Sequence, residues 1–139
     1  MNTGGENAAA LLGRVLMSVL FIWAGFGKLM AQGATAAMMT KMGLPLPEIA
    51  MIVAIVIELG GGLLVLFGLL TQPTAVVLGI WCIITALVAH TNFADRNMEI
   101  HFMKNVAMAG GFAYMAAFGA GAISLDALFR RRRTEATVA

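Results

Sequence analysis

The sequence predicts an all-α integral membrane protein, an antiparallel bundle of four spanning helices with a short interfacial helix between spans 1 and 2. Composition indicates this class, because 60% of the 139 residues are hydrophobic and 12% are charged, against about 25% charged in soluble domains. The run Ile49–Leu70 is long enough as a helix to cross the roughly 30 Å hydrocarbon core. It carries one acid, Glu58, near its middle.

Glu58 sets the main constraint on how the other spans pack. A carboxylate near the bilayer centre costs about 2.5–3.5 kcal/mol on insertion scales, which the surrounding apolar side chains offset. We therefore expect this helix to insert with Glu58 turned toward a neighbouring helix and a basic partner, in a polar pocket that opens outward. Arg14, Lys28 and Lys104 all lie at depths compatible with contact to Glu58, so each is a candidate for that basic partner.

The chain divides into three regions. We expect a disordered N-terminus over residues 1–7, one transmembrane domain over 8–125 and a basic cytoplasmic tail over 126–139. The four spans are expected at about 8–31, 48–70, 74–93 and 101–125. Residues 32–48 are too short and too polar to cross, and Gly43, Pro45 and Pro47 stop any helix. They predict the interfacial helix followed by a turn.

The first two spans each carry polar and small residues on one face. Arg14 and Lys28 lie fourteen residues apart, which places them on nearly the same face of the first span. Each either extends to its own membrane surface or turns inward toward Glu58. In the second span Gly61, Gly62 and other small residues share the face of Glu58, so another helix can approach closely. Pro73, in the turn at residues 71–74, predicts an antiparallel hairpin of spans two and three.

The third and fourth spans meet at a polar end. The third span ends at His90, which is either a satisfied interfacial residue or a ligand. His101, Lys104 and Asn105 fall on one face as the fourth span starts. Four spans place both termini on one side, and the arginine cluster at residues 130–133 assigns that side to the cytoplasm. We expect a multi-pass protein of the inner (cytoplasmic) membrane whose basic cluster is a topology signal or contacts anionic lipids, with no nucleic-acid partner.

Several cofactor classes are excluded by motif. The single cysteine, Cys82, permits no internal disulfide and no CxxC pair. The chain has no GxGxxG fingerprint and no iron–sulfur cysteines. Eleven methionines, several of them predicted on the outer side with His101, offer soft ligands for Cu(I). Methionine is more often a flexible apolar filler, so we predict no metal site.

Four segments carry the polar and small residues in a pattern known from one membrane-protein family. They are RVLMSVLFIWAGFGKL (Arg14–Leu29), IVIELGGGLLVLFGLLTQPTA (Ile55–Ala75), AHTNF (Ala89–Phe93) and HFMKNVAMAGG (His101–Gly111). The polar signature falls on Arg14, Gly25, Lys28, Glu58, Gly61, Gly68, His90, Lys104 and Asn105. Over nearly the whole chain, these segments resemble the DoxX family of small four-helix membrane proteins.

The resemblance implies a link to quinone redox chemistry, because the family name derives from a subunit of an archaeal thiosulfate:quinone oxidoreductase. On that reading Glu58, His90 and Lys104 are the catalytic candidates, and Arg14, Lys28, His101 and Asn105 are candidates for binding the quinone. His90 or Lys104 would bond a quinone carbonyl, Glu58 would relay a proton, and a partner redox protein or a bound quinol would supply the electrons.

Two other functions remain open: a non-enzymatic scaffold or accessory subunit, and a transporter for a small lipophilic molecule, which with four spans would need to form a homo-oligomer. Whether the chain is an enzyme also stays open. If it is, it is a component of a quinone-linked oxidoreductase.

Overall fold

A computed structural model describes residues 4–138, and every regular element in that part of the chain is helical. The elements are α1 (Gly4–Met30), α2 (Gln32–Lys41), α3 (Pro47–Ile55), the π-helical turn η1 (Val56–Gly60), α4 (Gly61–Phe67), α5 (Thr71–Ala89), α6 (Arg96–Phe118) and α7 (Leu125–Val138). The all-α prediction is confirmed. The short helix expected after the first span is α2, followed by a turn in which Gly43 has a positive φ.

Three helical segments of the described chain are long and apolar enough to cross a membrane. They are α1, the continuous rod Pro47–Phe67 formed by α3, η1 and α4, and α5. The fourth predicted span corresponds to α6, which is 23 residues long but carries Arg96, Glu99 and Lys104 in its first half. Helix α6 is not among the helices of the described chain that qualify by length and hydropathy.

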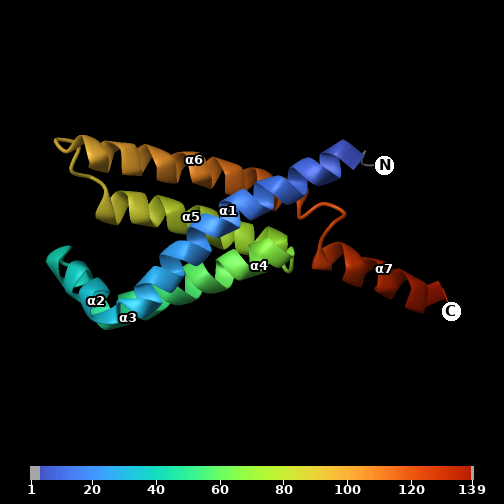
Figure 1. The fold of residues 1–139 in the computed structure, drawn as a ribbon, viewed down its shortest axis with the longest axis horizontal. Coiled ribbons are helices and arrows are strands. Elements are labelled where there is room, and N and C mark those ends of the chain that lie inside the picture. Colours follow the sequence, from blue (N-terminus) through green and yellow to red (C-terminus); the bar gives the residue numbers. More distant parts are fainter. Residues whose placement is uncertain (1–3, 139) are drawn as a thin grey trace.

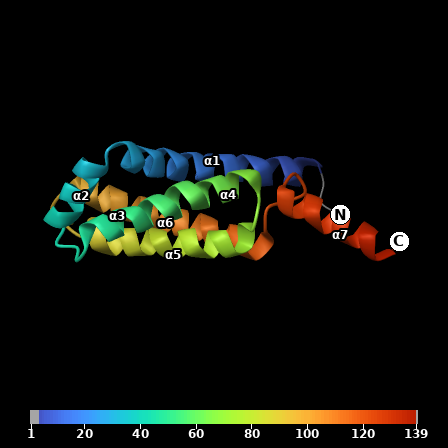
Figure 2. The same ribbon diagram turned by 90° about the horizontal axis from the view of Figure 1, so that it is seen from below.

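The long helices pack side by side, with α2 at one end and both termini at the other (Figures 1 and 2). Helix α1 packs against η1 and α4, α4 packs against α5, and α6 runs back along α5. The rod Pro47–Phe67 and α5 form the predicted antiparallel hairpin. Between the layers lies a core of Phe21, Val65, Ala75, Leu78, Cys82 and Phe112, in which the rings of Phe21 and Phe112 meet edge-on at 5.2 Å.

Several helix boundaries differ from the sequence expectation for local reasons. Helix α4 ends at Phe67 because Gly68 adopts a left-handed conformation at φ 65°, which glycine tolerates without strain. The turn is therefore Gly68–Leu70, and α5 starts at Thr71, before the expected position. Helix α6 starts early, because the Asp95 side chain accepts a hydrogen bond from the Asn97 N–H.

The boundaries near the two ends of the described chain also differ from the expectation. Helix α1 begins at Gly4, so the expected disorder does not extend over residues 4–7, while residues 1–3 lie outside the described part. The expected fourth span stops at Phe118, and residues 119–124 form a loop. The tail beyond it is the helix α7.

Glycines allow α1 to approach the rod closely, as the small-residue face predicted. A Cβ atom added at Gly25 of α1 would lie 2.5 Å from the backbone nitrogen of Leu59. One added at Gly62 would lie 3.0 Å from the backbone nitrogen of Ile22. Backbone atoms cannot move away as a flexible side chain can, so both contacts require glycine.

Replacing Gly25 with alanine should therefore destabilise the protein. The overpacked contact with Leu59 should cost about 1–3 kcal/mol, seen as a lower midpoint of thermal unfolding in detergent. The matched control is Gly27→Ala, where an added Cβ meets nothing within 4 Å and the helix preference of alanine is worth up to about 1 kcal/mol. Equal unfolding midpoints for the two variants would show that α1 and the rod are not in close contact.

Candidate functional site

The site is built around Glu58, a buried acid in the π-helical turn of the rod. The residue is 6% exposed. Its Oε2 accepts a hydrogen bond from Lys28 Nζ at 2.6 Å, and its Oε1 accepts one from Trp81 Nε1 at 3.1 Å. Three separate helical segments, α1, the rod and α5, therefore meet at one carboxylate.

The structure selects Lys28 as the basic partner from the three candidates that the sequence left open. Lys28 turns inward, and its side chain is 22% exposed. The paired ammonium offsets the cost of burying the carboxylate, provided that the remaining lone pairs are also satisfied. Trp81 supplies that further donor, so both oxygens of Glu58 have a partner.

Arg14 and Lys104 lie elsewhere. Arg14 is 3% exposed and donates to the backbone oxygens of Ala120, at 2.8 Å, and Leu66, at 3.3 Å. These contacts join α1 and α4 to the loop after α6, at the end of the bundle that holds the termini. Lys104 is exposed on α6 and lines a hollow of about 430 Å³ together with Arg96 and Glu99.

Trp81 was not among the residues singled out from the sequence. A signal for it existed, because an indole N–H inside an apolar span needs an acceptor. Glu58 is the one acid in the apolar run Ile49–Leu70, and the second and third spans were expected to form a hairpin. Periodicity does not say which face of the third span meets the second, so the pairing of Trp81 with Glu58 did not follow from the sequence.

A second polar cluster lies at the turn between α5 and α6. The rings of His90 and His101 stack with centroids 5.1 Å apart. Asn105 accepts a hydrogen bond from Thr85 Oγ1 at 3.1 Å and donates one to the backbone oxygen of His101 at 3.0 Å. His90 Nδ1 is buried and has no hydrogen-bond partner in the described part of the chain.

The predicted site residues are thus divided into separate groups rather than gathered in one pocket around Glu58. His90 follows Trp81 by nine residues, which is about 14 Å along a helix. Lys28 and Trp81 close around Glu58. Two hollows in the described part of the chain, of about 780 and 430 Å³, are lined by other residues.

A third cluster, which the sequence did not reveal, lies where α7 meets α5. Oδ1 and Oδ2 of Asp126 accept hydrogen bonds from the backbone N–H groups of Leu70, at 2.8 Å, and Thr71, at 2.9 Å. The Asp126 N–H donates to the Gly68 oxygen at 2.8 Å. Burial alone would raise the pKa of the Asp126 carboxyl, but the hydrogen bonds from Thr71 and Leu70 and the charge of Arg130 outweigh it, so the pKa is lowered.

Comparison with known proteins identifies the family of this chain. The sequence pattern of the DoxX family matches residues 9–91, from early in α1 to just after His90. The chain belongs to the DoxX family. It is 39% identical over 127 residues to "Inner membrane protein YqjF" of Escherichia coli K12, covering 91% of this chain and 96% of that protein. It is 37% identical over 121 residues to "Inner membrane protein YphA" of the same organism, covering 84% and 86%.

No solved structure gives a significant match. The DoxX match includes every member of the cluster formed by Lys28, Glu58 and Trp81. His101, Asn105 and Asp126 lie beyond the matched residues. The buried ion pair is therefore the part of the site that lies wholly inside the family's sequence pattern.

Breaking the ion pair on one side should cost more than removing it entirely. Lys28→Met leaves the Glu58 charge buried with no cation, which typically costs about 3–5 kcal/mol. The double variant with Glu58→Gln should recover part of that loss, measured by equilibrium unfolding in mixed micelles. Lys41→Met, at an exposed lysine of α2, is the control and should change little. Strictly additive losses in the double variant would contradict a direct pair.

Asp126 should stabilise the start of α5 in a pH-dependent way. Asp126→Ala removes both acceptors and should cost about 0.5–2 kcal/mol at neutral pH, the range for lost N-caps. Because the folded pKa is lowered from its ordinary value of 3.8, this stabilisation is present above pH 3.8 and is lost as the pH falls through the folded pKa. Unfolding midpoints of the two proteins should therefore converge in acid. Glu135→Ala, at an exposed acid of α7, should show no such difference at any pH.

Proposed function

We propose that this DoxX-family protein is a multi-pass protein of the inner membrane with four spans: α1, the rod Pro47–Phe67, α5 and α6. The names of both E. coli relatives support the location. Exposed apolar side chains on α6, such as Met103, Val106 and Tyr114, are suited to face lipid. Both termini lie at one end of the bundle, next to the arginines of α7, which favours the cytoplasmic side for that end.

Within that membrane, we propose that the protein acts as a quinone-binding subunit of a redox system. The observation that carries this proposal is the unpartnered, buried Nδ1 of His90, beside His101 and Asn105. A buried imidazole nitrogen without a hydrogen-bond partner costs about 1–3 kcal/mol. A ligand carbonyl would remove that cost, and a quinone headgroup combines carbonyl oxygens with a flat apolar ring that suits the stacked imidazoles.

The other polar residues have separate roles in this proposal. His90 would donate to the carbonyl, while Asn105, fixed by Thr85 and the His101 backbone, would hold the start of α6 in place. When bound, the quinone supplies two-electron, two-proton chemistry, and the electrons come from a partner redox protein. Lys28 and Glu58 hold an exchangeable proton between Nζ and Oε2, and Trp81 orients the carboxylate. Exposed Lys104 has no role in this proposal.

The geometry also favours a second candidate, a non-enzymatic accessory subunit. Both oxygens of Glu58 are already paired, as in a purely structural ion pair that fixes three helices together. On this alternative the protein binds a partner and no quinone, and the His90 cluster only closes the turn between α5 and α6.

Purification in mild detergent followed by mass analysis of the extracted lipids and quinones distinguishes the two. The first proposal expects the wild-type protein to retain quinone, and His90→Ala to lose it by about tenfold or more, equivalent to about 1.4 kcal/mol. Asn92→Ala, at an exposed position in the same turn, should retain it. The absence of quinone from folded wild-type protein, or equal retention by His90→Ala, would remove the redox proposal and leave the accessory role.

A further inference from the structure

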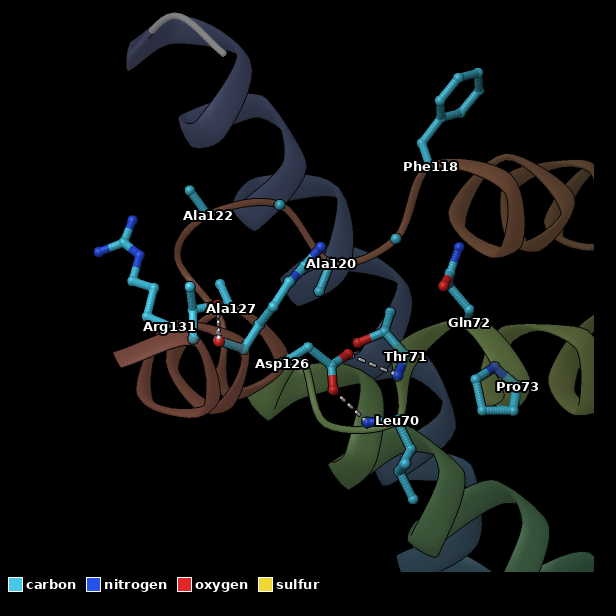
Figure 3. Close-up of a pocket in the computed structure, with 14 residues that line it drawn as sticks. Leu70, Thr71, Gln72, Pro73, Phe118, Ala120, Ala122, Asp126, Ala127 and Arg131 are labelled. Carbon is cyan, nitrogen blue, oxygen red and sulfur yellow. Dashed lines mark hydrogen bonds between the residues drawn. The ribbon is translucent and has the colours of Figure 1, made fainter. Parts of the chain in front are cut away.

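A hollow of about 780 Å³ lies at the end of the bundle that holds the termini, far from the His90 cluster (Figure 3). We call it the terminal hollow. Its walls are the start of α5, the chain at residues 118–122 and one face of α7. The lining includes the polar and apolar residues Leu70, Thr71, Pro73, Phe118, Arg130 and Arg131.

The terminal hollow is held in shape by specific contacts. Asp126 bonds the N–H groups of Leu70 and Thr71, as Figure 3 shows, and its own N–H bonds the Gly68 oxygen. These bonds hold the first turn of α7 against the start of α5, so Arg130 follows one turn later at the wall of the hollow. Arg14 donates a hydrogen bond to the Ala120 oxygen and thereby fixes the chain at residues 118–122, which forms another wall of the hollow.

The lining combines positive charge with apolar surface. Arg130 and Arg131 line the hollow together with one acid, Asp126, whose two oxygens accept hydrogen bonds from backbone N–H groups. Thr71 is fully buried at the start of α5, next to Asp126. Leu70, Pro73 and Phe118 supply apolar surface. Two guanidinium groups beside an apolar wall complement a phosphate that carries hydrocarbon chains.

The depth of the hollow favours a ligand from the bilayer. Helix α5 is one of the helices apolar enough to span a membrane, and its first residue, Thr71, lines the hollow. The hollow therefore lies where a spanning helix leaves the hydrocarbon, which is the level of lipid headgroups. We propose that the terminal hollow binds the phosphate of an anionic phospholipid through Arg130 and Arg131, while Leu70, Pro73 and Phe118 contact its acyl chains.

Such a lipid would stabilise the junction of α5 and α7 by mass action, because the unfolded chain lacks the hollow. The site is independent of quinone binding, since it lies at the other end of the bundle. Inorganic phosphate and a zwitterionic phospholipid are the other sources of phosphate, and a direct comparison distinguishes them.

The test uses the full chain in neutral detergent, with phosphatidylglycerol, phosphatidylcholine or inorganic phosphate added. We expect phosphatidylglycerol to raise the midpoint of thermal unfolding and to remain bound in native mass spectrometry, while the other two do neither. The double variant R130Q/R131Q should bind phosphatidylglycerol at least tenfold more weakly. The matched control R132Q/R133Q removes the same charge from the same helix at positions that do not line the hollow, and should bind within twofold of wild type.

Each other outcome overturns the proposal. Equal weakening by both double variants would mean diffuse attraction to the basic helix rather than a site. Protection by inorganic phosphate alone would identify a soluble anion as the ligand. Unchanged binding by R130Q/R131Q, with its helical content and unfolding midpoint in plain detergent as for wild type, would remove the arginines from any lipid site.

Discussion

The buried ion pair between Lys28 and Glu58 is the interaction on which the rest of the structure depends. A carboxylate inside an apolar span is tolerated only when its charge and its lone pairs are satisfied. Lys28 supplies the cation and Trp81 the second donor. Three helical segments must therefore stay in contact at one depth in the bundle. Where two of them approach closely, only small residues fit between them.

The glycines follow from this requirement. Lys28 reaches Glu58 because α1 lies directly against the rod, and this approach leaves no space for a Cβ at Gly25 or Gly62. The π-helical turn contains Glu58 itself. Such turns are often found at functional sites within α-helices. Close packing and the position of the charge are thus parts of one arrangement rather than separate features.

Much of this arrangement was predictable from periodicity, because residues of one helix face have fixed spacing. The inward direction of Glu58 is confirmed, and Arg14 and Lys28 both turn inward from α1, which was one of the two alternatives that their spacing left open. The partners were harder to predict. Lys28 could not be chosen over Arg14 by depth alone, and Asp126 caps a helix that begins 55 residues earlier. Helices α4 and α6 end where Gly68 and Gly119 adopt positive φ angles, and hydropathy does not reveal such backbone.

The most direct test of the ion pair is a distance measurement by solid-state NMR in lipid bilayers, with ¹⁵N at Lys28 Nζ and ¹³C at the Glu58 carboxyl carbon. A nitrogen–oxygen contact of 2.6 Å places these two nuclei close enough for a measurable dipolar coupling. Trp81→Phe should leave that coupling in place, because it removes only the second donor. No measurable coupling in the wild-type protein would show that Glu58 has another partner, and the explanation of the packing given above would be wrong.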